Sequence, residues 1–239
     1  MTWSIVIHDP ATDAFAVAVT TRAFAVGAMC PFVRAGVGAV STQSMTNRYL
    51  GPAILDGMAR GLSPAAAIEG ALAGDEGRGL RQVHAVDRLG RTAAFTGRNC
   101  VEWCGSADAP HVSVAGNMLT GPEVVRDTLA CVGSETGLDL PERLMAALDA
   151  GQAAGGDRRG RQSAAMRLTT TEDFPDLDLR VDDHADPLIE LRRLLGIWRR
   201  EGQPRLAQSP SRANPSGFTD LDAIEAGWRA RGIDLRFRR

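Results

Sequence analysis

The order of strand-like and helix-like segments is the feature of this sequence that most constrains its fold. The strand-like runs cover residues 4–8, 14–19, 37–41, 82–87, 91–95, 111–115, 162–169 and 177–181. The helical segments between them cover residues 52–60, a stretch that begins at Ser63, 122–131 and 141–153. Strands and helix pairs therefore come in groups and do not alternate one by one. This grouping predicts an α+β fold with antiparallel sheets and helix pairs on their outer faces.

Local signals support several of these segments. Residues 4–8 and 14–19 flank a turn-rich spacer with one proline and two aspartates, which predicts a β-hairpin. Ser63 followed by Pro64 is typical of a helix start, because serine caps free N–H groups and proline is tolerated in the first turn. A chain of 239 residues with 44% apolar side chains can bury one substantial core.

The C-terminal part of the sequence is predicted to be separable. Residues 185–200 have helical spacing, with leucines and a tryptophan on one side and arginines on the other. Residues 202–217 are rich in proline, serine and arginine and are expected to form an irregular linker. Residues 219–230 are expected to form a short capped helix. We therefore expect a main domain over residues 1–201 and a tail over 202–239. The leucine and tryptophan stripe is expected to pack on a second copy in a homo-oligomer.

All 27 basic residues are arginine, and the sequence contains no lysine. Walker-type phosphate loops, pyridoxal Schiff bases, lysine aldolases and Ser-Lys dyads need a side-chain amine, so these mechanisms are excluded. The α-amino group is the one amine left to act as a base or nucleophile. The net charge of −2 provides no global basic field, so no nucleic-acid partner is expected.

The sequence is expected to belong to a cytoplasmic protein. Its opening residues lack the basic segment and apolar core of a signal peptide, and no window approaches the roughly 18 uninterrupted apolar residues of a membrane span. The four cysteines are few and irregularly spaced, which suits reduced thiols better than a disulfide framework. We expect no membrane partner and no cofactor.

Several motifs carry a resemblance to a known family. They are Thr2-Trp3-Ser4-Ile5-Val6, Ala25-Val26-Gly27-Ala28, Gly36-Val37-Gly38-Ala39-Val40 followed by Thr42-Gln43, Gly116-Asn117-Met118-Leu119, the continuous stretch 150–163, and the stretch 178–184. On these residues the first 200 or so positions resemble domain-of-unknown-function family 1028, a relative of the N-terminal-nucleophile (Ntn) hydrolases. The resemblance implies a four-layer αββα sandwich of two antiparallel sheets with helix pairs outside. No established chemistry comes with it.

Thr2 is the candidate nucleophile. In the Ntn arrangement an N-terminal threonine, serine or cysteine attacks an amide, and its own α-amine, which titrates near pH 8, is the general base. Removal of the initiator methionine would place the hydroxyl and the amine on one residue at the start of the first strand. The alternative is that Thr2 is a structural strand residue. Ser4 is a weaker candidate, because three residues would have to be removed to expose it.

Supporting residues are predicted near other strand ends. Arg22 follows the second strand, where a guanidinium could supply an electric field and hydrogen bonds but could not shuttle a proton. Asn117 could donate its amide N–H to an oxyanion, or could form a turn. Asp157, in the Gly-rich bend over residues 155–160, and Ser163, in the strand that follows the second helix pair, could orient the α-amine. We expect these side chains, Arg161 and Thr2 to line one cleft.

Substrate binding is assigned to further polar side chains. Arg158, Arg159 and Arg161 could bind a substrate carboxylate in bidentate fashion, or Asp157 could simply neutralise them. Gln43 completes the predicted substrate-binding set.

No metal site is expected. Cys100, Cys104 and His111 offer suitable ligand types, but they lack the usual C-x-x-C pair and a clear fourth ligand. The run Asp182-Asp183-His184 lies between a strand and a helix, where such residues are commonly caps.

Two classes of function remain open. The first is an Ntn-type amidohydrolase that acts on a small, anionic amide. The second is a catalytically silent domain of the same fold that binds a small ligand or a protein partner, which the absence of lysine would suit. The state of the Thr2 amine discriminates between the two.

Overall fold

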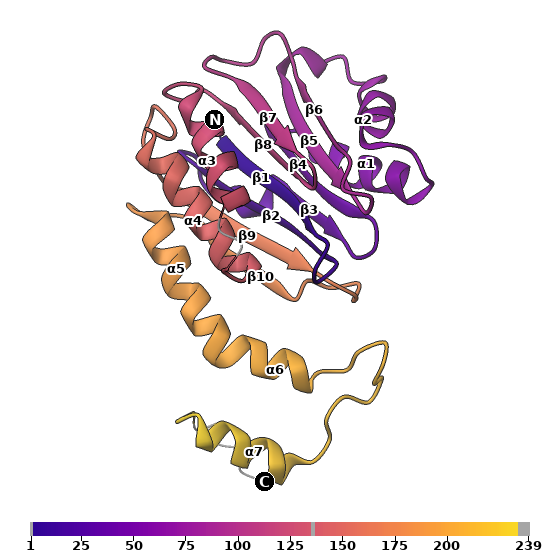
Figure 1. Cartoon of the computed structure of the whole chain (residues 1–239), viewed down its shortest axis with the longest axis vertical. Helices are drawn as coiled ribbons and strands as arrows, with labels where there is room; N and C mark the ends of the chain where they lie inside the picture. Colours follow the sequence, from indigo (N-terminus) through magenta and orange to yellow (C-terminus); the bar gives the residue numbers. More distant parts are fainter. Residues whose placement is uncertain (1, 135–136, 234–239) are drawn as a thin grey trace. The chain divides into compact units, whose positions relative to one another are not determined.

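The computed structural model describes residues 2–134 and 137–233. Two compact units make up the chain, Met1–Arg193 and Leu194–Arg239. The first unit contains both sheets and the helix pairs that cover them (Figure 1). No helix in the described ranges is long and apolar enough to cross a bilayer.

The first sheet has six strands in the order β10-β9-β2-β1-β8-β7. These strands are β1 (Thr2–Asp9), β2 (Ala14–Thr21), β7 (Gly105–Ala109), β8 (Val112–Asn117), β9 (Ser163–Thr169) and β10 (Leu177–Val181). Every neighbouring pair is antiparallel, and β1 lies between β2 and β8. Thr2 therefore opens a central strand, as predicted. The predicted N-terminal hairpin is formed by β1 and β2.

The second sheet has four antiparallel strands in the order β3-β4-β5-β6. These strands are β3 (Pro31–Arg34), β4 (Gly38–Ser44), β5 (Arg81–Asp87) and β6 (Thr92–Thr96). The two sheets stack on each other, mainly through β1 and β2 against β3, β4 and β5, and through β8 against β5.

Two helix pairs cover the outer faces of the sheets (Figure 1). Helices α1 (Leu50–Ala59) and α2 (Pro64–Leu72) pack on the four-stranded sheet, and α3 (Glu123–Ser134) and α4 (Leu140–Ala153) pack on the six-stranded sheet. Ser63 caps α2 by accepting a hydrogen bond from the N–H of Ala66, as the Ser-Pro signal predicted. The predicted αββα sandwich is thus confirmed.

The space between the two sheets is apolar at one end and polar at the other. Val6, Phe15, Val17, Ala39 and Val86 form a fully buried apolar cluster toward the ends of β1 and β5. Toward the start of β1, buried hydroxyl, amide and imidazole side chains replace the apolar ones. Buried polar groups need internal partners, so this polar half requires a hydrogen-bond network.

The described part of the second unit is mostly helical. Helix α5 (Pro187–Ile197) begins in the first unit, and its last turn belongs to the second, together with a π-helical turn at Trp198–Gly202, α6 (Gln203–Gln208) and α7 (Leu221–Ala230). The expectation of an irregular linker over 202–217 was therefore wrong for its first part, because Pro204 lies in the first turn of α6, where its missing N–H costs nothing. The predicted domain boundary after residue 201 falls inside this helical segment. Trp228 of α7 is buried and donates its ring N–H to Gln208 at 3.0 Å.

Candidate functional site

One end of the six-stranded sheet gathers four polar residues at strand termini. Thr2 begins β1 opposite Asn117 at the end of β8, and Thr21 at the end of β2 is opposite Ser163 at the start of β9. Antiparallel pairing explains this, because the start of one strand meets the end of its neighbour. We refer to Thr2, Thr21, Asn117 and Ser163 as the Thr2 end of the sandwich.

Thr2 is held by hydrogen bonds on both its side chain and its backbone. The residue is 5% exposed, and its hydroxyl donates to the Thr21 hydroxyl at 3.1 Å. Its carbonyl oxygen accepts from the side-chain amides of Gln43 and Asn117, each at 3.5 Å. In the described residues, no carboxylate or imidazole contacts the Thr2 hydroxyl. A base for this hydroxyl would therefore have to come from elsewhere.

A network of buried polar side chains fills the space between the sheets next to Thr2. Gln82 is its centre: the Gln82 side-chain oxygen accepts from Gln43 and Asn117, both at 2.9 Å. The Gln82 side-chain N–H groups donate to the Gly116 carbonyl at 2.8 Å and to the Thr96 hydroxyl at 3.0 Å. The members of the network are Ser4, Ser41, Gln43, Gln82, His84, Ser113 and Asn117, each at most 2% exposed. We call them the inter-sheet network.

His84 lies in the middle of the inter-sheet network, between two serines. Its Nε2 is 2.7 Å from the Ser4 hydroxyl, and its Nδ1 is 3.1 Å from the Ser113 hydroxyl. Ser4 donates its own proton to Gln43 at 2.7 Å, so Nε2 is the protonated nitrogen of the ring and Nδ1 accepts from Ser113. Burial lowers the pKa of His84 to about 3, so the ring is neutral at physiological pH.

Asp157 connects the Gly-rich bend after α4 to the loop after β2. Its side chain is completely buried, and its carboxylate accepts from the backbone N–H of Arg22 at 2.8 Å and of Arg159 at 2.9 Å. Gly155 and Gly156 both have positive φ, 117° and 60°, which lets the chain turn sharply into Asp157. An isolated bridge joins Asp157 to Leu119. The carboxylate thus fixes the position of both segments.

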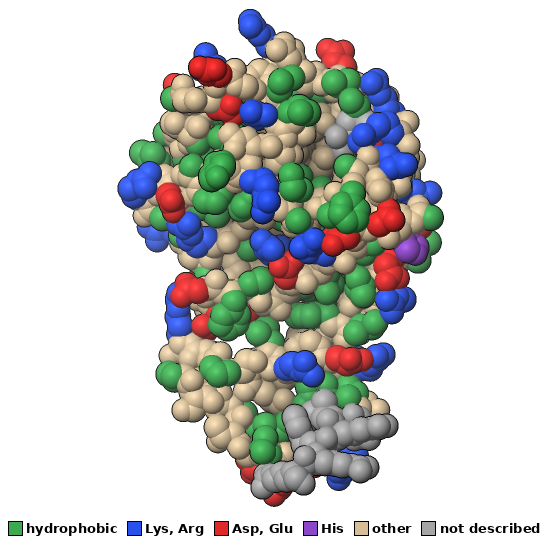
Figure 2. Space-filling view, turned by 180° about the vertical axis from the view of Figure 1, so that it is seen from behind, with side chains coloured by type: hydrophobic (Ala, Val, Ile, Leu, Met, Phe, Trp, Pro, Cys, Tyr) green, Lys and Arg blue, Asp and Glu red, His purple; other side chains and the backbone are tan. Residues whose placement is uncertain are grey.

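The arginines of this bend differ in how they are partnered. Arg159 forms an ion pair with Asp157 at 3.1 Å, and Arg161 forms one with Asp186. Arg22 donates to the side chain of Gln162. Arg158 is exposed, and within the described residues its guanidinium has no polar partner. Elsewhere on the surface, basic and acidic side chains are interspersed on the face shown in Figure 2.

The Ser163 side chain forms hydrogen bonds to the loop that follows β2. Its hydroxyl donates to the Ala23 carbonyl at 2.6 Å and accepts from the Val26 N–H at 3.1 Å. Cys30, at the end of this loop, is buried, and burial raises the pKa of its thiol to about 12. The thiol is therefore protonated at neutral pH and is not a nucleophile.

The predicted site residues fall into three groups. Thr2, Gln43 and Asn117 contact one another through the inter-sheet network, and Gln43 is fully buried with its amide group bonded to protein partners. A second group surrounds the loop after β2 and the Gly-rich bend, and its members are Arg22, Asp157, Arg159 and Ser163. Arg158 and Arg161 form the third group, whose guanidinium groups contact neither of the others in the described residues.

Sequence reasoning missed Thr21, Gln82 and His84. A usable signal was present, because polar residues occupy every second position of otherwise apolar strands, as in Gln82 and His84 of β5. Side chains two apart in a strand point to the same face. Ser41 and Gln43 of β4 repeat the pattern, as do Thr2 and Ser4 of β1.

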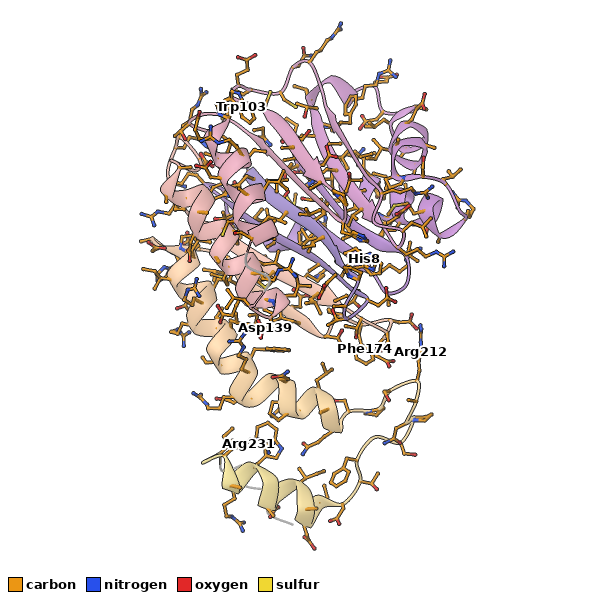
Figure 3. The ribbon with its side chains drawn as sticks, viewed as in Figure 1. His8, Trp103, Asp139, Phe174, Arg212 and Arg231 are labelled. Carbon is orange, nitrogen blue, oxygen red and sulfur yellow. The ribbon has the colours of Figure 1, made fainter. Side chains whose placement is uncertain are left out.

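Two histidines outside the inter-sheet network, His8 and His111, contact each other at the far end of β1. His8, labelled in Figure 3, has its Nδ1 3.1 Å from Nδ1 of His111, and its Nε2 3.0 Å from Asp13. His111 is thus engaged away from Cys100 and Cys104. In the residues that the structure covers, no group of three or more His, Cys, Asp or Glu side chains has the geometry of a metal site.

Fold and site together define a four-layer α+β sandwich in which a buried polar network leads to the first residue of a central strand. A model described as a family of unknown function, DUF1028, matches residues 2–191, and the chain belongs to this family. The crystal structure of protein SPO2555 from Silicibacter pomeroyi, assigned to the same family, has 30% sequence identity and a TM-score of 0.85, over 92% of this chain and 96% of that one.

Two more distant structures are those of Anbu, described as an ancestral β-subunit. The protein from Yersinia bercovieri has a TM-score of 0.39 at 11% identity, over 87% of this chain and 98% of that one. A mutant from Hyphomicrobium sp. strain MC1 has a TM-score of 0.41 at 10% identity, over 88% and 99%. Similarity at this level supports no inference about the present site. No curated protein matches the chain.

Proposed function

We propose that this protein is an amidohydrolase that uses Thr2 as an N-terminal nucleophile. The observation that carries the proposal is the environment of the Thr2 hydroxyl, which is fixed by Thr21 and contacts neither a carboxylate nor an imidazole of the described residues. The α-amine of Thr2 could deprotonate this hydroxyl without help from any other side chain. It also suits a sequence without lysine.

The reaction would proceed in two steps. The Thr2 hydroxyl oxygen attacks the amide carbon, and the hydroxyl proton passes to the neutral α-amine. Collapse of the tetrahedral intermediate breaks the C–N bond, and the leaving amine takes that proton, which leaves an ester on Thr2. Water then attacks the ester with the α-amine again as base, and releases the acid and the Thr2 hydroxyl.

Asn117 and Gln43 are proposed as positioning residues. Both donate to the Thr2 carbonyl at 3.5 Å, and both are held by Gln82 at 2.9 Å. This arrangement fixes the backbone of the residue that carries the nucleophile, and fixed geometry is a large part of catalytic efficiency. The N–H groups of both amides are engaged in this contact and in the network, so we propose no oxyanion role for them.

Recognition of an anionic substrate is proposed for Arg158 and Arg22. Both side chains are exposed. Arg158 follows Asp157 in the sequence, and the Arg22 backbone N–H donates to the Asp157 carboxylate, so both arginines lie near Asp157. Arg158 has the freer guanidinium, which can bind a carboxylate through two parallel hydrogen bonds. The proposed substrate is therefore a small amide that carries a carboxylate.

The test is hydrolysis of a panel of N-acyl amino acids and their uncharged amide analogues by protein whose first residue is Thr2. Thr2→Ala should reduce turnover at least about a thousandfold, and Thr2→Ser should retain part of it. Arg158→Ala should raise KM for the anionic substrates roughly tenfold with little change in kcat. Arg60→Ala, an exposed control at the C-terminal end of α1, should change neither.

Two results would contradict the proposal. Turnover that survives Thr2→Ala would exclude Thr2 as the nucleophile. Absence of turnover by protein with a free Thr2 amine, together with binding of the same amides that is weakened by Arg158→Ala, would favour the catalytically silent ligand-binding domain.

A further inference from the structure

A groove is formed by the edge strand β6, helix α2 and residues 76–80. It lies next to the place where α2 packs on β6 (Figure 1). It consists of two adjoining cavities of about 720 Å³ and 270 Å³ that share Arg78 and Phe95 in their walls. The larger cavity alone is within the size range of small-molecule sites. We call the two together the β6 groove.

One end of the β6 groove is apolar. Ile68 and Leu72 of α2 and Ala93 of β6 line it together with the Phe95 ring. Ala93 is small and shares this face of β6 with Phe95, which leaves room over the strand for an aliphatic or aromatic group. Such a group would remove these apolar walls from water, which is favourable.

The other end of the β6 groove carries two arginines. Arg78 and Arg98 both line the larger cavity, together with the Asn99 amide. Both guanidinium groups belong to exposed residues and have no hydrogen-bond or ion-pair partner in the part of the chain that the structure covers. Two unpaired guanidinium groups in one cavity can bind a carboxylate by charge-assisted hydrogen bonds.

The backbones that carry these two arginines are fixed against each other. The N–H of Asn99 donates to the Gly79 carbonyl at 2.7 Å, and the N–H of Gly97 donates to the Arg81 carbonyl at 2.8 Å. A Cβ on Gly97 would lie 2.5 Å from the Arg78 carbonyl oxygen, so the two segments are in direct contact. The backbone at both arginines is therefore held in place, which lowers the entropic cost of binding a ligand.

Asp75, three residues before Arg78 in the sequence, does not compete for these arginines. Asp75 accepts from Arg81 at 2.9 Å, from Asn47 at 3.0 Å and from the Gly77 N–H at 2.9 Å. Two other carboxylates, Glu76 and Glu69, line the polar and the apolar end of the groove respectively. Their negative charges oppose binding of an anion and should lower its affinity.

We propose that the β6 groove is a binding site for an amphipathic monocarboxylate, with its head on Arg78 and Arg98 and its chain over Phe95 toward α2. Charge complementarity at one end and apolar walls at the other select this class over a free inorganic anion or an uncharged lipid. This site is independent of the proposed reaction at Thr2.

Isothermal titration of the full chain with octanoate tests the proposal, with acetate, octylammonium and 1-octanol as comparison probes. Octanoate should bind, acetate should bind at least about tenfold more weakly because it lacks the chain, and octylammonium should not bind. Raising the salt concentration should weaken octanoate binding, because the arginines are exposed. Equal affinity for acetate and octanoate, or no octanoate binding, would overturn it.

Variants locate the site. Arg78→Ala combined with Arg98→Ala should weaken octanoate binding at least about tenfold, whereas Arg88→Ala, an exposed arginine after β5, should leave it unchanged. Ala93→Trp should block the apolar end, because Ala93 shares the face of β6 that packs toward α2 with Phe95, and Glu76→Gln should tighten binding by removing a competing charge. Thermal unfolding confirms that each variant is folded. Octanoate binding that survives both the double arginine variant and Ala93→Trp would show that the ligand binds elsewhere.

Discussion

The buried imidazole of His84 shows how single residues stabilise this interior. Placing a polar side chain between two sheets is costly unless all of its hydrogen bonds are satisfied. His84 meets that condition through Ser4 and Ser113, which lie on strands β1 and β8 of the facing sheet. The network therefore specifies how the two sheets are aligned, since a shift of either sheet would leave these groups unpaired.

His84 should make stability depend on pH. Its pKa is about 3 in the folded chain and near 6.5 in the unfolded chain, so below pH 6.5 the unfolded chain binds the extra proton. The free energy of unfolding should therefore fall as pH falls from 6.5 toward 3, by up to about 1.4 kcal/mol per pH unit. Urea titrations of the wild type and of His84→Gln, which keeps one donor and one acceptor, measure this component as a difference in slope. Parallel pH profiles for the two proteins would contradict the account.

Individual site residues could be predicted from sequence only in part. Thr2 was proposed from the family resemblance. Asn117 and Arg22 were proposed because they follow strands, and strand ends in an antiparallel sheet must meet, which depends only on strand order. Which groups bond to which could not be found. Gln43 and Ser163 were assigned to the site, but their partners come from segments 39 and 140 residues away, and no local pattern reveals such contacts.

At the scale of elements, the packing of β1 against α3 and α4 depends on a helix glycine. Gly151 of α4 faces Trp3 of β1 and Thr128 of α3. A Cβ at Gly151 would lie 2.8 Å from the Trp3 ring nitrogen and 2.3 Å from the Thr128 hydroxyl oxygen. Glycine normally weakens a helix interior, so its presence here is explained by packing.

Gly151→Ala should therefore destabilise the protein, by about 1–3 kcal/mol, although alanine is the better helix former. Gly70 of α2 is the matched control: it is exposed, and nothing lies within 4 Å of its added Cβ. Gly70→Ala should stabilise by roughly 0.5–1 kcal/mol. Denaturant midpoints measured side by side give both values. A neutral or stabilising Gly151→Ala would show that the helix can shift to accommodate the methyl group.

The elements that sequence analysis missed have weak local signals. Strand β7 reads Gly-Ser-Ala-Asp-Ala, without a single β-branched or aromatic residue, and β3 begins with a proline. Both are edge strands, where such residues are tolerated. The apolar central strands and the capped helices were predicted correctly, because their patterns are produced by burial on sheet faces and by local capping.

At the scale of the whole molecule, the sheets and the helix pairs that cover them lie within the first unit. Deleting Gln203–Arg239 should therefore leave one cooperative thermal transition, since it removes no strand and none of the helices α1 to α4. Calorimetry of the truncated and full-length chains makes the comparison. Loss of the transition on truncation would show that the second unit is required for the first to fold.

The central claim is that Thr2 acts as a nucleophile through its own amine, and the state of that amine in the native protein tests it most directly. Mass spectrometry of the N-terminal peptide from protein made in its own organism measures this state. The account predicts a peptide that begins at Thr2 with an unmodified amine. A peptide in which any residue or blocking group precedes Thr2 would contradict it, because the amide nitrogen that remains could not serve as the base.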